Sequence, residues 1–295
     1  MAQAYIFPGQ GSQHVGMGKE HYENNSEFAA YIDQAVDILG FDIKKILFEG
    51  PEDQLKQTEV TQPAIYLHSV ALFNTLQQTP DMVAGHSLGE ISALAAVNAL
   101  SFEDGLQIVS KRGKLMQDAG ESNPGTMAAI IGMKDEDVEA VCSQVKADSG
   151  LEVVPANFNS PGQVVISGDK EAVGSAIELA KEKGCRMAKK LPVSGAFHSA
   201  LMQPAYDGLK KSLEEVDIKK STSPVYSNYT GGPTQDPEQI RSNLLNQLLN
   251  PVKWRQSIEA MANDGAEHFV EVGPGKVLQG LVKRTLKDVE TSGYQ

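Results

Sequence analysis

The fold is decided by residues 82–90, which read Met82-Val83-Ala84-Gly85-His86-Ser87-Leu88-Gly89-Glu90. The first three residues are apolar and predict a short buried strand, and the Ala-rich segment 90–100 predicts a helix. Residues 85–89 match the pattern G-x-S-x-G. Between a strand and a helix, this pattern places the serine on a tight turn with its hydroxyl exposed at the end of the sheet. The stretch therefore predicts an α/β protein with Ser87 as a candidate nucleophile.

Further strands and helices are predicted on both sides of this stretch. Apolar runs that end at turn residues predict strands at 4–7, 224–228 and 268–272. Apolar residues at helical spacing predict helices at 61–76, from Ser101 to about Ala119, and at 200–216, 237–249, 251–263 and 276–287. Thr61 and Ser101 are the expected N-caps of the first two helices, because their side-chain oxygens can accept a backbone N–H.

A second unit is predicted after the breaker cluster Glu-Ser-Asn-Pro-Gly at 121–125. Strands are expected at 126–133, 153–158, 163–167 and 186–191, and helices at 135–147 and 170–183. The order β-α-β-β-α-β is typical of a ferredoxin-like domain. We therefore expect a ferredoxin-like subdomain at 125–195, inserted into an α/β-hydrolase-like catalytic domain that comprises 1–124 and 196–295.

Composition and charge exclude several classes of protein. The chain has 295 residues, of which 41% are hydrophobic and 22% charged, and its formal net charge is −12. Nucleic acids and anionic membranes attract basic surfaces, so neither is an expected partner. The N-terminus lacks the positive region of a secretory signal, and the most apolar stretch, 91–100, is far shorter than the ~20 residues of a membrane span. Cys142 and Cys185 lack the spacing of a metal site and are typical of core thiols, so we expect a cytoplasmic protein without a bound metal.

A serine nucleophile needs a base, and the chain has six histidines. His198 is favoured, because it lies in a loop after the inserted unit and gives the chain order Ser then His of α/β-hydrolase-like enzymes. His14, near a glycine-rich turn, is the next candidate. His68 is on the apolar face of its helix and is expected in the core, and His86 should point away from Ser87. No Asp or Glu stands out as a partner of the base, but a backbone carbonyl could also fix its tautomer.

Two backbone amides are candidates for stabilising an oxyanion. The amide of Leu88 lies at the start of the helix that follows the serine. The turn at 8–13 follows the first strand, where ligands bind in open α/β folds. Gly9 and Gly11 would leave the amide of Gln10 free to donate there, although an ordinary tight turn fits the same residues.

Arg112 has two interpretations. The apolar stripe of its helix comprises Leu106, Val109, Gly113 and Met116, and Arg112 lies at the edge of this stripe. An arginine in this place usually extends its charged end into solvent. Alternatively, its planar guanidinium is suited to bind a carboxylate with two parallel hydrogen bonds.

Five motifs occur together along the chain, and they are Phe7-Pro8-Gly9-Gln10-Gly11-Ser12-Gln13, Gly85-His86-Ser87-Leu88-Gly89-Glu90, Arg112-Gly113, Gly195-Ala196-Phe197-His198-Ser199 and Asn250-Pro251-Val252-x-Trp254. In this order they resemble the malonyl-CoA:acyl carrier protein transacylase family of bacterial type II fatty acid synthesis. The resemblance extends from Ala4 to about Leu286 and includes the inserted unit.

The resemblance implies a role for each candidate in the catalytic apparatus. Ser87 would accept the acyl group and His198 would be its base. The backbone carbonyl of Gln247 would orient His198, which answers the missing carboxylate. The amides of Gln10 and Leu88 would form the oxyanion hole.

The resemblance also implies the substrates. The malonyl carboxylate would bind Arg112, in an acyl pocket lined by Met116, Asn159 and Phe197. A ping-pong reaction would carry malonyl from malonyl-CoA to acyl carrier protein. No cofactor is implied, because phosphopantetheine arrives on CoA and on the carrier protein as substrate. The family resemblance favours a monomer.

Two other functions fit the residues. A serine esterase or thioesterase would use the same serine but admit water to the acyl-serine, and a non-catalytic module would only bind the carrier protein. Two basic clusters are candidates for receiving an acidic carrier protein, or are simply solvated surfaces. They are Lys181, Lys183, Arg186, Lys189 and Lys190 in the inserted unit, and Lys283, Arg284 and Lys287 near the C-terminus.

Overall fold

The computed structural model describes residues 2–193 and 195–295, and its larger part is built on a six-stranded sheet. The strand order is β10-β9-β1-β2-β7-β8, and all neighbours pair in parallel except β8, which is antiparallel to β7. The strands are β1 (Ala2–Phe7), β2 (Met82–Gly85), β7 (Val225–Tyr226), β8 (Pro233–Thr234), β9 (Ala266–Val272) and β10 (Glu290–Tyr294). The α/β class predicted from the sequence is confirmed.

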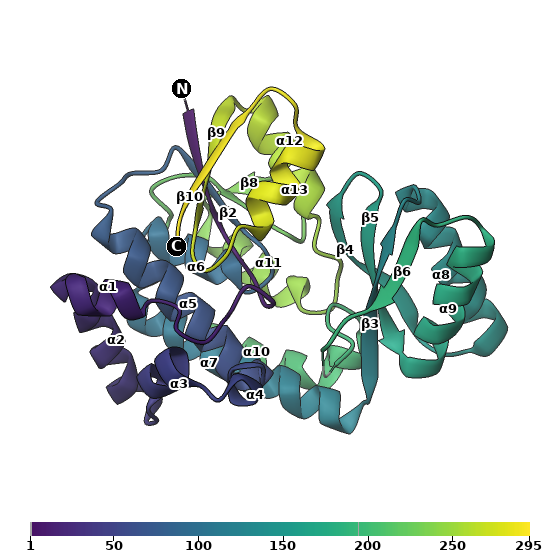
Figure 1. Cartoon of the computed structure of the whole chain (residues 1–295), viewed down its shortest axis with the longest axis horizontal. Helices are drawn as coiled ribbons and strands as arrows, with labels where there is room; N and C mark the ends of the chain where they lie inside the picture. The colour runs from purple at the N-terminus through teal and green to yellow at the C-terminus, as the bar shows by residue number, and fades with distance from the viewer. Residues whose placement is uncertain (1, 194) are drawn as a thin grey trace.

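Helices cover both faces of this sheet (Figure 1). Alternate side chains of β1 point to opposite faces, so Tyr5 and Phe7 pack with the core of α2, α5, α6 and α7, while Ala4 and Ile6 pack with that of α12 and α13. The helices of this part are α1 (Lys19–Asn24), α2 (Ser26–Leu39), α3 (Ile43–Glu49), α4 (Glu52–Leu55), α5 (Thr58–Thr75), α6 (Gly89–Ala96), α7 (Phe102–Ser122), α10 (Gln203–Glu214), α11 (Pro237–Gln247), α12 (Trp254–Asn263) and α13 (Val277–Thr285), with a short 3-10 turn, η1 (Ala200–Met202).

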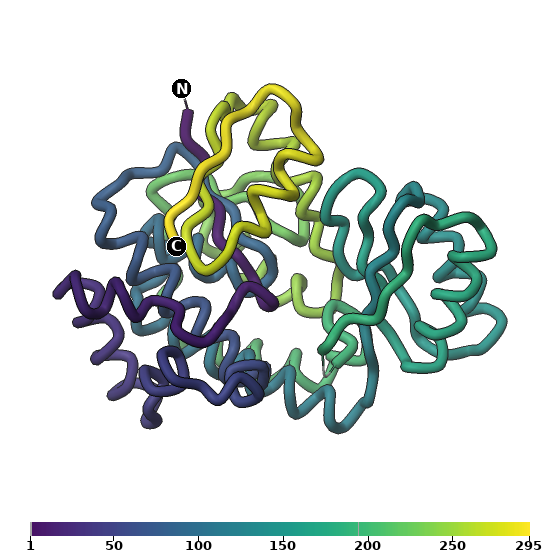
Figure 2. Tube along the Cα trace, viewed as in Figure 1, coloured from purple at the N-terminus to yellow at the C-terminus, as the bar shows by residue number. Residues whose placement is uncertain are grey.

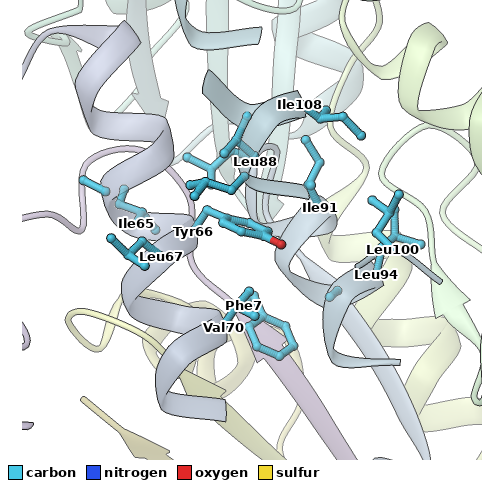
Figure 3. Packing of buried hydrophobic residues seen from close by; sticks show 14 of the residues in the cluster. Phe7, Ile65, Tyr66, Leu67, Val70, Leu88, Ile91, Leu94, Leu100 and Ile108 are labelled. Carbon is cyan, nitrogen blue, oxygen red and sulfur yellow. The ribbon is translucent and has the colours of Figure 1, made fainter. Parts of the chain in front are cut away.

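The core between α5 and α6 supports the turn that follows β2. Figure 3 shows Ile65 and Tyr66 of α5 beside Leu88 and Ile91, with Phe7 of β1 close by. Leu88 is only 1% exposed. Because its side chain is fixed in this core, the backbone immediately after Ser87 is fixed as well.

A smaller unit lies beside the larger one (Figures 1 and 2). Its elements are β3 (Gly125–Ile131), α8 (Asp135–Ser149), β4 (Val153–Ser160), β5 (Gln163–Asp169), α9 (Lys170–Glu182) and β6 (Met187–Lys190). The strands form an antiparallel sheet of order β4-β5-β3-β6. The two helices pack on the sheet around a hydrophobic cluster of their own, separate from the clusters of the larger sheet.

Hydrogen bonds and an ion pair hold the two units together at several points. The amide of Phe158 in β4 donates to the carbonyl of Val252 at 2.9 Å. Arg255 of α12 forms a 2.9 Å ion pair with Asp135 of α8. Arg284 of α13 donates to Gln163 of β5 at 2.9 Å. The cleft between the units therefore has fixed walls on both sides.

Three helices start three residues away from the prediction, and α10 is one of them because the 3-10 turn η1 occupies residues 200–202. α5 begins at Thr58, so Thr61 is not its N-cap; instead the Thr61 hydroxyl donates to the carbonyl of Leu55 at 2.6 Å. α12 begins at Trp254, three residues later than expected, because Val252 forms a bridge with β4. Ser101 is confirmed as the N-cap of α7, and its side chain accepts the amide of Asp104.

Other elements were not predicted at all. These are α1 to α4, the two-residue β8 and the exposed edge strand β10. None of the helices in the described residues has both the length and the hydropathy needed to cross a membrane.

Candidate active site

The turn between β2 and α6 brings backbone segments closer than any side chain would allow. A Cβ atom at Gly85 would lie 1.9 Å from the carbonyl carbon of Gly89, and one at Gly89 would lie 2.2 Å from the carbonyl oxygen of Phe7. Ser87, at the apex, has a φ of +54°. This left-handed conformation is strained for a serine, and such strain concentrates at functional sites. The turn presents Ser87 to a cavity between the two units.

Ser87 and His198 meet at the base of this cavity. Ser87 Oγ lies 2.9 Å from His198 Nε2, and His198 Nδ1 lies 2.8 Å from the backbone carbonyl oxygen of Gln247. A carbonyl oxygen can only accept a hydrogen bond, so Nδ1 carries the proton and Nε2 is left to accept one from the serine. His198 also has a left-handed φ, of +59°, which directs its ring from the loop into the cavity.

The electrostatics keep His198 neutral. Burial, and then the positive charge of Arg112, lower the pKa of His198 to about 3, although the hydrogen bond with the Gln247 carbonyl opposes the shift. The imidazole is therefore unprotonated at neutral pH and available as a base.

Two amides face the same cavity. Gln10 and Leu88 both line it, and within the described residues neither backbone N–H donates to another part of the chain. The N–H of Ser87 is different, because it donates to Asn228 Oδ1 at 2.7 Å. Two unused donors near the nucleophile are what an oxyanion intermediate requires.

Arg112 is buried, and the interpretation in which it extends into solvent is wrong. Its residue is 2% exposed, and its guanidinium donates to Gln62 Oε1 at 2.7 Å, to Gln247 Oε1 at 3.0 Å and to Ser87 Oγ at 3.0 Å. No carboxylate of the described chain forms an ion pair with it. Burial lowers the pKa of Arg112 to about 10, and nearby Glu90 limits the shift. Arg112 is thus a cation held by neutral partners at the edge of the cavity.

The cavity has a volume of about 240 Å³ and receives residues from both units. Every residue predicted for the site lines it, except Gln247, which lies behind His198. Phe197 and Met116 give it apolar walls. Asn159 of β4 completes the opposite side and lies 2.8 Å from His86 Nε2 through its side-chain oxygen.

The remaining histidines take no part in the pair. His86 turns toward Asn159, as expected. His68 lies in the core, 2% exposed, where burial lowers its pKa to about 3. His14 does not line the cavity, so its prediction as the alternative base has no support in the structure.

Three polar residues of the site were missed from the sequence. Gln62 holds the guanidinium of Arg112, Asn228 holds the backbone at Ser87, and Glu90 accepts the backbone N–H of Asn228. Each is almost completely buried. A polar residue within an apolar helix is a signal that could have identified Gln62 and Glu90, whereas nothing local distinguishes Asn228.

The site has a serine, a neutral histidine as its base and two backbone amides for an oxyanion. These are the features of serine acyl-transfer enzymes, in which the serine takes up an acyl group and passes it on. The family described as "Acyl transferase domain" matches residues 4–294. The chain is 41% identical over 293 residues to the malonyl CoA-acyl carrier protein transacylase of Staphylococcus aureus (strain MRSA252), covering 99% of this chain and 95% of that protein. With the transacylase of Bacillus subtilis (strain 168) it shares 44% over 291 residues, covering 98% and 92%.

Solved structures agree with these relatives. An acyl carrier protein S-malonyltransferase from Vibrio cholerae superposes with a TM-score of 0.96 at 41% identity, covering 100% of this chain and 97% of that one. A malonyl-transacylase in complex with a type II PKS acyl-carrier protein gives 0.96 at 39% identity, covering 100% and 96%. The chain therefore belongs to the acyl transferase family, and within it to the malonyl CoA-acyl carrier protein transacylases.

Proposed function

We propose that this acyltransferase moves a malonyl group from malonyl-CoA to the phosphopantetheine thiol of acyl carrier protein, and so supplies malonyl-carrier protein for fatty acid synthesis. The observation that carries the proposal is Arg112, a buried cation without a carboxylate partner, whose guanidinium lies 3.0 Å from Ser87 Oγ. A malonyl group on Ser87 would bring a carboxylate to that cation, whereas an acetyl group would leave it unpaired.

In the first half-reaction, Ser87 Oγ attacks the thioester carbonyl of malonyl-CoA while its proton passes to His198 Nε2. The amides of Gln10 and Leu88 would donate to the oxyanion of the tetrahedral intermediate. When the carbon–sulfur bond breaks, the CoA thiolate takes the proton from His198 and leaves. The product is a malonyl ester on Ser87.

In the second half-reaction, the roles repeat with a new thiol. The phosphopantetheine thiol of the carrier protein gives its proton to His198 and attacks the ester carbonyl. The carbon–oxygen bond then breaks, and Ser87 recovers its proton from His198. The carbonyl of Gln247 stabilises the imidazolium at Nδ1 in both halves.

The substrates would be recognised by the residues around Arg112. Its hydrogen bonds with Gln62 and Gln247 fix the guanidinium, so the carboxylate would meet a preorganised cation. Met116, Phe197 and Asn159 would surround the short acyl chain.

Side chains and backbone amides of the chain are sufficient for both half-reactions, so we propose no bound cofactor or metal. Phosphopantetheine enters only as part of each substrate. The net charge of −12 gives no reason to add nucleic acid or membrane as a partner. Cys142 and Cys185 are both free thiols, which agrees with a cytoplasmic location, and we propose a monomer.

For the domain organisation, we propose an α/β-hydrolase-like catalytic domain of residues 1–124 and 196–295 with a ferredoxin-like subdomain inserted at 125–195. The separate hydrophobic clusters support this division. The two connections between the parts lie side by side, because a Cβ atom at Gly125 would lie 2.5 Å from that of Ala196.

The experiment that tests the function is intact mass spectrometry after mixing the protein with malonyl-CoA. A malonyl adduct that survives denaturation and maps to Ser87 is expected, and holo-acyl carrier protein should then remove it. Rapid release of free malonate without the carrier protein would instead identify a thioesterase. An unmodified Ser87 would leave only a carrier-binding role.

A further inference from the structure

A buried polar cluster lies beneath the nucleophile, and two of its three residues, Asn228 and Glu90, have no role in the mechanism above. It comprises Asn228, Glu90 and Gln247, which we call the elbow clamp. Asn228 is 0% exposed, Glu90 2% and Gln247 1%. Polar groups this deeply buried are costly unless each finds a partner, so their arrangement is informative.

Asn228 spans the turn that carries Ser87. Its Nδ2 donates to the carbonyl of Gly85 at 2.7 Å, and its Oδ1 accepts the N–H of Ser87, also at 2.7 Å. The side-chain amide of Asn228 thus binds both Gly85 and Ser87. Because the backbone of Ser87 is left-handed, Ser87 can neither continue the strand nor begin the helix. Both bonds constrain the backbone from which Ser87 Oγ projects.

Glu90 connects this side of the site to the histidine. Its Oε2 accepts the backbone N–H of Asn228 at 2.9 Å and Nε2 of Gln247 at 2.8 Å. Gln247 is the residue whose carbonyl holds His198, and its Nε2 also donates to the carbonyl of Ser87 at 3.1 Å. A single carboxylate oxygen therefore joins the supports of nucleophile and base.

We propose that Asn228 is a positioning residue that holds Ser87 Oγ against His198 Nε2. Glu90 binds both Asn228 and Gln247, and so fixes the position of Asn228 relative to the Gln247 carbonyl that holds His198. This inference rests on the proposed function for the identity of the nucleophile. Neither Asn228 nor Glu90 lines the cavity, so their action is through the backbone and not on the substrate.

Substitutions at both residues test the proposal, and Tyr226→Phe is the matched control. Tyr226 lies two residues before Asn228, is 1% exposed and donates to Asp264 at 2.6 Å, so Tyr226→Phe removes a nearby, partly buried hydrogen bond without touching the clamp. Asn228→Ala should lower kcat about 100-fold, as expected for a misplaced reacting group, with KM changed little. Tyr226→Phe should keep the wild-type kcat.

The rate at which a fluorophosphonate probe labels Ser87 gives a second readout that needs no malonyl-CoA. It should fall with kcat in Asn228→Ala. A wild-type protein that reacts with the probe but not with malonyl-CoA would refute the proposed function and leave the clamp testable. Glu90→Ala should lose labelling, whereas Glu90→Gln, which retains an acceptor oxygen for both donors, should recover most of it.

Asn228→Asp adds a readout in pH. At neutral pH the introduced carboxylate would place an oxygen against the Gly85 carbonyl, where the wild type has a donor at 2.7 Å. Protonation restores a donor, so the labelling rate relative to wild type should rise as the pH falls. Glu90, His198 and Arg112 are the other titratable groups of this network, and burial raises the pKa of Glu90 to about 7. Because the new carboxyl would shift the pKa of Glu90 further, the profile is repeated with Asn228→Asp combined with Glu90→Gln, in which the rise should persist.

Thermal unfolding of each variant shows whether it is folded in the assay, and if Asn228→Ala is not, the Asn228→Asp profile and the Glu90 pair decide the question. The proposal is overturned if Asn228→Ala labels at the wild-type rate, if Tyr226→Phe loses as much activity, or if the Asn228→Asp ratio does not change with pH.

Discussion

The hydroxyl of Ser87 is a weak nucleophile until a base takes its proton, and His198 Nε2 lies 2.9 Å away to do so. Ser87→Ala should abolish acylation and leave the fold intact, because it removes one hydroxyl and no core volume. His198→Ala should also stop turnover at neutral pH. Both are measured by malonyl transfer to carrier protein, with circular dichroism as the check on folding. A His198→Ala enzyme with most of its activity would place the base elsewhere.

Arg112 should decide which acyl group is transferred. Removing one member of a buried, hydrogen-bonded charge pair costs about 2–5 kcal/mol. For Arg112→Ala, this predicts a loss of roughly 30- to 5,000-fold in kcat/KM for malonyl-CoA, at about 1.36 kcal/mol per decade. Acetyl-CoA has no carboxylate to lose, so its transfer should change little.

The ratio of kcat/KM for malonyl-CoA over acetyl-CoA measures this effect. Arg112→Lys should restore the ratio only in part, because an ammonium group cannot form two parallel bonds with a carboxylate. Equal losses for both substrates would mean that Arg112 acts on the fold or on Ser87 and not on the malonyl group.

The pH dependence of the reaction should report the environment of His198. Only the neutral imidazole acts as a base, so activity falls when the pH drops through the pKa of His198. Burial and the charge of Arg112 both lower this pKa, to about 3, so the rate should persist well below the ordinary histidine value of about 6.5. Arg112→Ala removes the larger of the two charge effects on this pKa, the other being that of His86, and should move the acid limb of acetyl transfer upward. A limb that stays in place would contradict this coupling.

Among the elements, the contact between α6 and β1 tolerates no side chain. In Gly89→Ala the new Cβ would meet the backbone of Phe7 at 2.2 Å, and we expect a loss of at least about 3 kcal/mol in the free energy of unfolding. Gly174→Ala in α9 is the matched control, because nothing lies within 4 Å of its Cβ. It should stabilise the protein by roughly 0.5–1 kcal/mol. Urea denaturation compares the two, and similar stabilities would refute the packing argument.

Elements with a local signal could be predicted from the sequence. The Ser101 cap fixes the start of α7, and apolar runs fix β1 and β2. The predicted start of α5 was wrong for two reasons. The first turn of the helix has little apolar periodicity, and Pro63 lies inside the helix. β10 was missed because four of its five residues are exposed, so pairing with β9, rather than burial, makes it a strand.

The site shows the same division between local and distant information. Ser87 and Leu88 belong to one local motif. The pairing of Ser87 with His198 joins residues 111 positions apart, and the burial of Arg112 depends on Gln62 and Gln247 from two other helices. The family resemblance implied the pairing of Ser87 with His198. The partners of Arg112 were not predicted, because spacing within one helix left its side chain undecided and Gln62 lies on another helix.

For the whole molecule, we expect the mouth of the cleft to determine how a carrier protein approaches. Arg284 contacts Gln163, and Lys190 precedes Leu191; both Gln163 and Leu191 line the cavity. Lys183 lies at the C-terminal end of α9, three residues before Arg186, whose amide donates to the carbonyl of Ile131. At the opposite end of β6, the amide of Leu191 donates to the carbonyl of Met127, and both of these residues line the cavity. In the basic cluster of the inserted unit, the end at Lys190 therefore borders the cleft, whereas the end at Lys183 does not.

Charge reversal distinguishes Arg284, at the mouth of the cleft, from Lys183, which lies away from it. Arg284→Glu should slow transfer to an acidic carrier protein at low salt and leave transfer to a free pantetheine thiol largely unchanged. Lys183→Glu, with the same change in charge but away from the mouth, should have little effect on either. Added salt should reduce the difference, since screening weakens steering. Equal slowing by both variants would indicate a general effect of net charge.

The two glutamines that hold Arg112 also fix the distance between its guanidinium and Ser87. With its guanidinium fixed by Gln62 and Gln247 and 3.0 Å from Ser87 Oγ, Arg112 cannot withdraw without breaking buried hydrogen bonds. The carboxylate of a malonyl group on Ser87 is one methylene from the ester carbonyl, and it would reach the guanidinium without any movement of Arg112. The next longer diacid, a succinyl group, would have to fold back or displace the arginine, so we expect the enzyme to select acyl length as well as charge.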